Sequence, residues 1–346
     1  YATVSVDPVD FTGERVLIIG KGNSAFETAD NLLETAAVIH VAGPNPVRLA
    51  WHTHFVGHLR AVNNNFLDTY QLKAQNAVLN VGVEKITKLD GGYQVDFRFT
   101  RGIRSFFYDR VIVCTGFRFD ASIFDETCRP ALAVNDRFPE LTGAYESANV
   151  DGLYFAGTLT QQLDFKKSTN GFIHGFRYGV RALYRILEER YHDVPWPHFD
   201  VAPYPEELAA AVLDRANRSS ALWQQFGVQA DVVVVPATGP ARYYREIPVR
   251  HLEGREFERS DDVFAVTLEY GPDPQDKVPF DGTIVHASEG AVTSYFHPVI
   301  RHYRAGGPVA AHHLASDVEN NWRHPDAHVG PLEDFLKNSM AKQASR

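Results

Sequence analysis

The first forty residues alternate between apolar runs and glycine-rich breaks, which predicts a strand, a helix and a second strand. Residues 15–19 (RVLII) form a short apolar run that ends at Gly20, as a buried parallel strand does. Apolar side chains then recur at helical spacing from Ser24 to Glu34, and residues 37–41 (AVIHV) are strand-like. This order predicts the start of a βαβ unit.

The next part of the chain predicts a helix followed by a small antiparallel sheet. The stretch 55–79 is mostly helical in pattern. An Asp-Gly-Gly turn at 90–92 separates the first two of three strand-like runs, at 84–89, 93–100 and 103–108. Residues 110–116 (RVIVCTG) then return to a buried strand that ends at glycine.

Further along, residues 152–157 (GLYFAG) predict another short strand, and 170–191 predict a long helix with one apolar face. Beyond 198 the pattern is that of a separate mixed α/β segment. Its predicted helix lies at 206–216, and its predicted strands lie at 231–236, 263–268, 282–286 and 291–295.

Composition and charge narrow the class of protein. The 346 residues are 44% hydrophobic and 22% charged, which suffices for a large core and two or three domains. Lys and Arg number 34 against 43 Asp and Glu, and a net charge of −9 argues against nucleic acid or a membrane surface as partner. No apolar run approaches the roughly 18 residues of a transmembrane helix.

The cysteines and histidines exclude some chemistry. Cys114 and Cys128 form no Cys-x-x-Cys pair, which excludes dithiol reductase chemistry within this chain. Cys114 lies in an apolar run and predicts a buried structural thiol. The histidines between 297 and 328 match no standard ligand spacing, so no metal is predicted.

The turn at residues 20–25 (GKGNSA) fits the dinucleotide pattern G-x-G-x-x-A between a strand and a helix. Glycines allow the backbone to approach a pyrophosphate, whose charge the helix N-terminus favours. The alternative is a glycine-rich turn that binds nothing. The predicted cofactor contacts here are Gly20, Gly22, Asn23, Ser24 and Ala25.

The end of the second strand bears on which nucleotide binds. An acid that would hold the ribose of NAD belongs about 20 residues after the first glycine, and residues 40–43 (HVAG) contain none. Arg48 is the nearest fixed positive charge and suits a 2′-phosphate. The sequence therefore favours NADP over NAD, with a solvated loop arginine as the alternative for Arg48.

Two further strand ends predict cofactor contacts. Thr115 and Gly116 close one strand, while Gly157 and Thr158 close another. A helix then opens after Ser168, and its dipole would favour the electron-rich edge of a reduced flavin. The residues predicted there are Thr169, Asn170 and Gly171. For either motif alone, the alternative is an ordinary strand that ends in a loop with no role in cofactor binding.

Taken together, residues 21–24 (KGNS), 114–117 (CTGF) and 153–157 (LYFAG) resemble the flavin-containing monooxygenase group. Segments such as 47–51 (VRLAW) and 68–73 (DTYQLK) are most similar to its branch that contains the endoplasmic-reticulum flavoprotein associated with degradation. The resemblance implies an α/β flavoprotein with two dinucleotide-binding, Rossmann-like domains and a mixed α/β C-terminal extension. Its implied cofactors are FAD and NADP.

The resemblance also implies a reaction. NADPH would reduce the flavin, and O₂ would form a flavin C4a-(hydro)peroxide that oxygenates a nucleophilic nitrogen or sulfur; N-hydroxylation of a small amine or amino acid is favoured. One alternative is an NADPH-dependent flavin reductase or oxidase that serves a redox partner. Another is a non-enzymatic interaction protein that retains the nucleotide-binding fold.

Some family features are missing from the chain. It holds no second G-x-G-x-x-G, and Thr158 stands where many relatives carry an acid. Because residue 1 is also not Met, we expect an FAD-binding part to precede this chain. The predicted domains are a linker at 1–14, an NAD(P)-binding domain at 15–113, the C-terminal half of the FAD domain at 114–197, and the extension at 198–346.

Four cations near the predicted flavin-side helix suggest the substrate class. Lys166 and Lys167 precede the helix, while His174 and Arg177 lie in its first turns. Together they would suit the carboxylate of a small carboxylated amine. The alternative is that the lysines are solvated or contact FAD phosphate.

Location and assembly are less constrained. Arg outnumbers Lys by 25 to 9, a bias common in bacterial genes of high GC content, which favours a bacterial cytoplasmic protein. The reticulum lumen is the alternative for a eukaryotic member of the branch. A homo-oligomer stays open.

Overall fold

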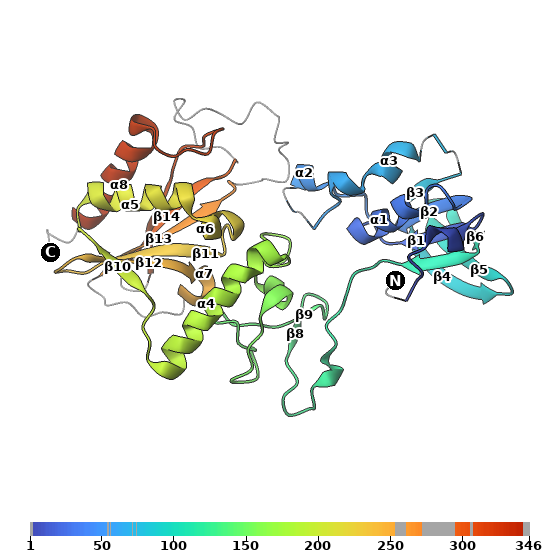
Figure 1. Cartoon of the computed structure of the whole chain (residues 1–346), viewed down its shortest axis with the longest axis horizontal. Helices are drawn as coiled ribbons and strands as arrows, with labels where there is room; N and C mark the ends of the chain where they lie inside the picture. The colour runs from blue at the N-terminus through green and yellow to red at the C-terminus, as the bar shows by residue number, and fades with distance from the viewer. Residues whose placement is uncertain are drawn as a thin grey trace. The chain divides into compact units, whose positions relative to one another are not determined.

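The computed structural model describes residues 3–53, 55, 57–70, 72–73, 75–252, 261–271, 295–304 and 307–341. The chain divides into two compact units, which are Tyr1–Phe117 and Arg118–Arg346. Figure 1 colours the first unit blue to teal and the second green to red. Each unit has its own sheet and core, and the two are described separately.

A parallel four-stranded sheet in the order β3-β2-β1-β7 organises the first unit. Its strands are β1 (Arg15–Ile19), β2 (Val38–Gly43), β3 (Ala77–Asn80) and β7 (Arg110–Val113). Helix α1 (Asn23–Leu32) connects β1 to β2 and buries Phe26 and Ala29 against the Val16 and Ile18 side of β1. The predicted βαβ unit is confirmed.

The other side of this sheet is covered by the predicted antiparallel meander, which is also confirmed. Its strands are β4 (Gly82–Leu89), β5 (Gly92–Phe99) and β6 (Gly102–Tyr108). Leu17 points to the face opposite Val16 and packs with Val95, Phe97 and Tyr108. Strand alternation thus places α1 and the meander on opposite faces of one sheet.

The long helix predicted over 55–79 is wrong. The only helices in the described part of that stretch are η2 (Ala61–Asn63) and α3 (Asn65–Thr69), and a short helix α2 (Ala50–Thr53) precedes it. Its last residues become β3 instead, where they pair with β2, and the Asn76 side chain accepts a 2.8 Å hydrogen bond from the Ile39 amide. Pairing with an existing sheet edge overrides the local helical pattern.

An antiparallel six-stranded sheet in the order β10-β12-β11-β13-β14-β15 forms the second unit. Its strands are β10 (His198–Val201), β11 (Gln229–Val235), β12 (Ala241–Pro248), β13 (Asp262–Glu269), β14 (His297–Arg304) and β15 (Gly307–His313). Every residue of the central strand β11 is buried, since both faces of the sheet are covered.

Helices cover the two faces of this second sheet. Val232 and Val234 of β11 pack with Ala182 of α4 (Ile173–His192), whereas Val233 packs with Leu208 of α5 (Pro205–Arg218) and with α8 (Gly330–Ala341). Two short helices, α6 (Ser220–Gln224) and α7 (Val249–Leu252), and the π-helical turn η7 (Pro325–Val329) lie in the connections. Predicted helices 170–191 and 206–216 are confirmed.

Two predictions for the second unit need correction. Residues 152–157 form no strand, because Tyr154 makes only an isolated bridge to Glu146 and no other described segment pairs with it. The predicted separation of 114–197 from 198–346 does not match the compact units, because one unit spans Arg118–Arg346 and Tyr145, Ile186 and Trp196 share a core with β11 and β13. Of the predicted strands, 282–286 lies outside the described residues, and so does 291–295 except for Tyr295.

The first part of the second unit consists mainly of connections. It contains two short 3-10 helices, η3 (Ala121–Ile123) and η4 (Gly157–Leu163). It also contains a two-stranded sheet of β8 (Leu132–Ala133) and β9 (Phe138–Pro139). A 3-10 turn, η1 (Pro8–Phe11), precedes β1 in the first unit.

Candidate functional site

Gly20 and Gly22 of the β1–α1 turn serve different purposes. Gly20 has a φ of +127°, and a Cβ there would lie 2.2 Å from the carbonyl oxygen of Cys114. Glycine is therefore needed for the chain to pass the end of β7. Gly22 has an ordinary φ of −95° and would place a Cβ in open space, with nothing within 4 Å. Gly22 thus leaves room for a ligand against the backbone.

The N-terminus of α1 is open to an anion. Gly22 is its N-cap residue and no side chain caps the helix. Ala25 is completely buried and packs in the core of the unit, which brings the helix start close to β1. Because uncapped amides at a helix start favour negative charge, the geometry fits a pyrophosphate at this turn.

Asn23 and Ser24, which the motif predicts as cofactor contacts, make hydrogen bonds within the protein. The Asn23 side chain donates to the His58 carbonyl at 2.8 Å and accepts from the Arg60 amide at 2.9 Å. It therefore fastens the 57–63 loop to the helix start. The Ser24 carbonyl accepts from the Thr28 hydroxyl at 2.7 Å. A contact of either residue with the cofactor stays a prediction.

Lys21, which the motif treats as a variable position, crosses the carboxyl ends of three parallel strands. Its ammonium donates to the Asn45 carbonyl at 3.0 Å and to the Asn80 side chain, and its methylenes lie next to Gly43. Burial lowers the pKa of Lys21. Sequence reasoning missed this residue; the lack of an acid at the end of β2 was the available signal.

The predicted 2′-phosphate residue lies beyond β2. Arg48 is exposed, and its guanidinium makes no hydrogen bond or ion pair within the described part of the chain. His40 offers no competing charge, because burial lowers its pKa and its ring contacts the Tyr108 hydroxyl at 2.7 Å. Arg48 therefore keeps its donors for a ligand.

Thr115 and Gly116 lie at the same edge of the sheet as the glycine turn. Ile19 pairs with Val113, so the ends of β1 and β7 are adjacent. Both predicted residues are exposed, and Gly116 has a φ of +88° with nothing near its Cβ position. Burial raises the pKa of the neighbouring Cys114 thiol, as expected for a structural cysteine.

The predicted flavin-side residues of the second unit divide into exposed and buried groups. Gly157 opens η4 with a φ of +73° and open space around it, and Thr158 is exposed. Thr169 and Asn170 are buried, and the Thr169 hydroxyl contacts the Gln224 carbonyl. A Cβ on Gly171 would meet the Gln161 side chain at 2.6 Å. The geometry leaves little surface on Thr169 or Asn170 for a ligand.

A buried carboxyl that sequence reasoning missed lies between these groups. Asp164 accepts a 3.0 Å hydrogen bond from the Asn170 amide, and burial raises its pKa to about 6. Asp164 Oδ1, Ser168 Oγ and both polar side-chain atoms of Asn170 are buried and have no hydrogen-bond partner among the described residues. Such unsatisfied interior groups raise the energy of a fold.

The four predicted substrate cations make different contacts. Lys166 lies over the Phe165 ring at 5.3 Å, Lys167 is exposed, and His174 stacks on Phe172 at 5.5 Å. Arg177 donates to the Tyr178 hydroxyl at 2.7 Å and lines a pocket with other arginines. These contacts join Lys166, His174 and Arg177 to three different aromatic neighbours.

Comparison with known proteins identifies the family. Residues 2–157 match the model of the pyridine nucleotide-disulphide oxidoreductases. A protein of Mus musculus called FAD-dependent oxidoreductase domain-containing protein 2 is 35% identical over 391 residues, covering 98% of this chain. The chain belongs to the FAD- and NAD(P)-dependent oxidoreductases. The family predicted from the sequence is thereby confirmed at this level.

A relative of the same description from Danio rerio is 32% identical over 413 residues and again covers 98% of this chain. The chain spans 58% and 59% of the mouse and zebrafish proteins. The activity of a whole relative therefore does not transfer directly to this chain.

Solved structures show weaker similarity. Bacillithiol disulfide reductase Bdr (YpdA) from Bacillus cereus is 16% identical with a TM-score of 0.32, covering 44% of each chain. Lysine monooxygenase NbtG from Nocardia farcinica is 14% identical with a TM-score of 0.34, covering 43% of this chain and 45% of that one. Neither similarity indicates an activity.

The described residues contain no group of three or more His, Cys, Asp or Glu side chains placed to hold a metal ion. None of their helices combines the length and apolar character needed to cross a bilayer.

Proposed function

We propose that this chain carries the NADPH-binding part, and a section of the flavin-binding part, of a monooxygenase that oxygenates a nucleophilic nitrogen of a small amine or amino acid. The observation that carries the proposal is the uncapped start of α1 beside the open space at Gly22. Backbone amides at such a turn bind a pyrophosphate.

The residues of the turn have distinct parts in nucleotide binding. The first-turn amides of α1 would hold the pyrophosphate, and Gly22 would let it approach the backbone. Arg48 would meet a 2′-phosphate, since its guanidinium is exposed and the end of β2 carries no acid that would repel one. Lys21 would hold the ends of β2 and β3 in place beside this site through its hydrogen bonds to Asn45 and Asn80.

FAD, when bound, accepts hydride from NADPH and passes electrons to dioxygen. In this chain Gly157 and Thr158 would contact FAD, because Gly157 has open space around it and Thr158 is exposed. A pair of thiols in this chain is a poor acceptor for electrons from the reduced flavin, because Cys114 is buried and the pKa of its thiol is raised. This supports dioxygen as the acceptor over an internal disulfide.

A carboxylated amine is the substrate class we favour. Lys167 exposes positive charge close to the start of α4, where helix amides also favour an anion. Lys167 and these amides would anchor the carboxylate while the unprotonated amine is oxygenated, so turnover should rise as the pH approaches the amine pKa.

The decisive experiment uses the full-length, flavin-loaded protein. Gly22→Asp would place a carboxylate against the pyrophosphate, so NADPH-driven flavin reduction should disappear while dithionite reduction survives. Gly82→Asp is the matched control, because Gly82 also has open space around it and lies at the start of β4 instead of in the β1–α1 turn. Normal reduction by NADPH in Gly22→Asp would refute the cofactor assignment.

The type of reaction is tested separately from cofactor binding. Acidic amino acids and neutral amines should be compared for NADPH and O₂ consumption and for the oxygenated product. One product formed per NADPH supports the monooxygenase. NADPH oxidation that yields only hydrogen peroxide, or only a reduced redox partner, would instead establish the oxidase or reductase alternative. Equal coupling with uncharged amines would remove the carboxylate anchor.

A further inference from the structure

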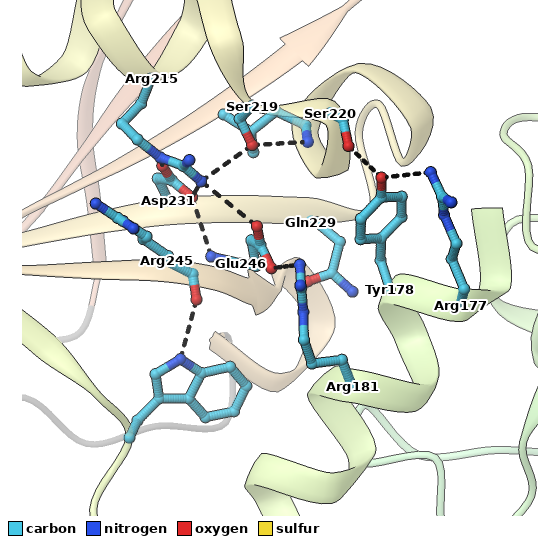
Figure 2. A network of polar contacts seen from close by, with 12 residues as sticks. Arg177, Tyr178, Arg181, Arg215, Ser219, Ser220, Gln229, Asp231, Arg245 and Glu246 are labelled. Carbon is cyan, nitrogen blue, oxygen red and sulfur yellow. Dashed lines mark hydrogen bonds and ion pairs between the residues drawn. The ribbon is translucent and has the colours of Figure 1, made fainter. Parts of the chain in front are cut away.

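A pocket of about 540 Å³ in the second unit carries four arginines that the proposed function does not use. Figure 2 shows most of its wall, to which α4, the α5–α6 junction and β12 contribute. The volume lies within the roughly 300–1,000 Å³ usual for small-molecule sites. Its lining residues are Arg177, Tyr178, Arg181, Arg215, Arg218, Ser219, Ser220, Ala221 and Glu246.

The arginines approach the pocket from two sides. Arg177 and Arg181 come from one face of α4, one helical turn apart. Arg215 and Arg218 come from the last turn of α5. The lining holds four guanidinium groups and one acid, Glu246, and positive charge remains in excess after Asp231 and Asp214 pair with Arg215 and Arg218. Such a wall favours an anion.

Acidic partners fix some of these arginines without using all of their donors. The completely buried Asp231 accepts from Arg215 Nε at 2.7 Å, and the Glu246 carboxylate contacts both Arg215 at 3.5 Å and Arg181. Arg218 pairs with Asp214 at 3.1 Å on the surface. Each guanidinium carries five N–H donors, so these pairs leave donors for a ligand.

Glu246 holds its position under backbone strain. It adopts a φ of +60° next to an irregularity in the β11–β12 pairing, and its amide donates to Asp231 Oδ1 at 3.0 Å. A non-glycine residue keeps such a conformation only where its surroundings determine it, and such residues gather at functional sites. In this conformation the Glu246 carboxylate contacts both Arg181 and Arg215.

Arg177 and two hydroxyl groups complete the donor set. The Arg177 guanidinium stacks over the Tyr178 ring at 4.7 Å and donates to its hydroxyl at 2.7 Å, and no acid among the described residues forms an ion pair with it. The Tyr178 hydroxyl also contacts Ser220 Oγ. Figure 2 shows this chain of groups from Arg177 to Ser220 along one side of the network. Arg177 is thus the cation with most capacity for a ligand.

We propose that this pocket binds the phosphoryl group of a small organic phosphate, at a site separate from the nicotinamide nucleotide and the flavin. A phosphoryl group has oxygens that point in several directions, so it can accept from the α4 arginines and the α5 arginines together. A planar carboxylate presents one edge and matches a single guanidinium fork. The pocket also has more room than the oxyanion alone would fill.

Inorganic phosphate is the probe for the first test, with the full chain at constant ionic strength set by chloride. Calorimetry should show saturable binding, and the melting temperature should rise with phosphate by mass action. Arg177→Ala should raise the phosphate Kd about tenfold, because it removes a charge-assisted contact while leaving the paired arginines in place. The melting temperature without phosphate should change little.

Arg185→Ala is the matched control, because Arg185 lies on the same helix, stacks on Tyr184 and is not among the pocket residues. Its phosphate Kd should stay within twofold of that of the unsubstituted chain. Absence of saturable binding, or equal weakening in the two variants, would overturn the proposal. Acetate that binds as tightly as phosphate at equal ionic strength would overturn the phosphoryl assignment.

A final arm separates this pocket from the flavin site. Bound flavin in the full-length protein should remain the same in Arg177→Ala, and phosphate should not displace it. Loss of flavin in this variant together with competition between phosphate and FAD would show that the arginines hold the flavin pyrophosphate, and the separate site would be refuted. Because this test needs no turnover, its result is independent of the proposed monooxygenase activity.

Discussion

Gly20 and Cys114 approach so closely that a Cβ on Gly20 would lie 2.2 Å from the Cys114 carbonyl oxygen. The Cys114 amide in turn donates to the Ile19 carbonyl at 2.7 Å, directly before the glycine. The first glycine of the dinucleotide motif is thus required by the packing of two strand ends. The second, Gly22, faces open space.

This difference predicts that alanine at position 20 lowers stability, whereas alanine at position 22 weakens nucleotide binding. Gly20→Ala should lower the free energy of unfolding by about 3 kcal/mol, from the clash and the positive φ. Gly22→Ala should change it by less than about 1 kcal/mol, yet weaken NADPH binding by narrowing the backbone cradle. Urea unfolding and NADPH titration measure the two effects, and equal stability losses would contradict the assignment.

Arg48 predicts a preference between the two nicotinamide nucleotides. Arg48→Ala should raise the Kd for NADPH about tenfold and that for NADH less than twofold, because only NADPH carries the 2′-phosphate. Fluorescence titration of both nucleotides provides the measurement. Arg101→Ala, in the exposed turn between β5 and β6, is the control. Parallel losses for both nucleotides would remove Arg48 from the phosphate site.

Asp164 predicts a pH dependence of stability. Burial raises its pKa to about 6 in the folded chain, so the folded state binds its proton more tightly than the unfolded state does. Its contribution to stability is therefore complete below about pH 4 and is lost as the pH rises through about 6. The loss is about 2–3 kcal/mol.

The experiment compares Asp164→Asn with the unsubstituted chain, so that the other titrating groups cancel. From pH 4 to pH 7, the unfolding free energy of Asp164→Asn should rise by about 2–3 kcal/mol relative to that of the unsubstituted chain. Denaturant unfolding at several pH values measures it. A difference that is constant with pH would show that Asp164 is not perturbed.

The buried partner of Arg215 predicts which pocket arginine supports the fold. Asp231 is completely buried, and Arg215→Met would leave its charge without the guanidinium, at a cost of about 3–5 kcal/mol. Arg218→Met should cost less than about 1 kcal/mol, because its pair with Asp214 is exposed. Chemical denaturation of both variants would test this, and similar losses would contradict it.

Local patterns in the sequence determined much of the first unit. The βαβ start and the meander follow from apolar periodicity and glycine turns, because their contacts are between segments close in the chain. The glycine turn also carried the family resemblance. The stretch 55–79 escaped prediction, because its last residues form β3 only where β2 offers an edge.

The second unit depended far more on tertiary structure. The sequence shows Arg177 and Arg181 four residues apart and Arg215 and Arg218 three apart, as two separate helical pairs. Their meeting requires β11 and β12 to place Asp231 and Glu246 between them, and that long-range pairing is invisible to local periodicity. The sequence by itself determined the strand, turn and helix of the nucleotide motif, although the close approach that requires glycine at position 20 comes from the distant end of β7. Only the tertiary structure decided which charges share a pocket, because the sheet sets distances between residues far apart in the chain.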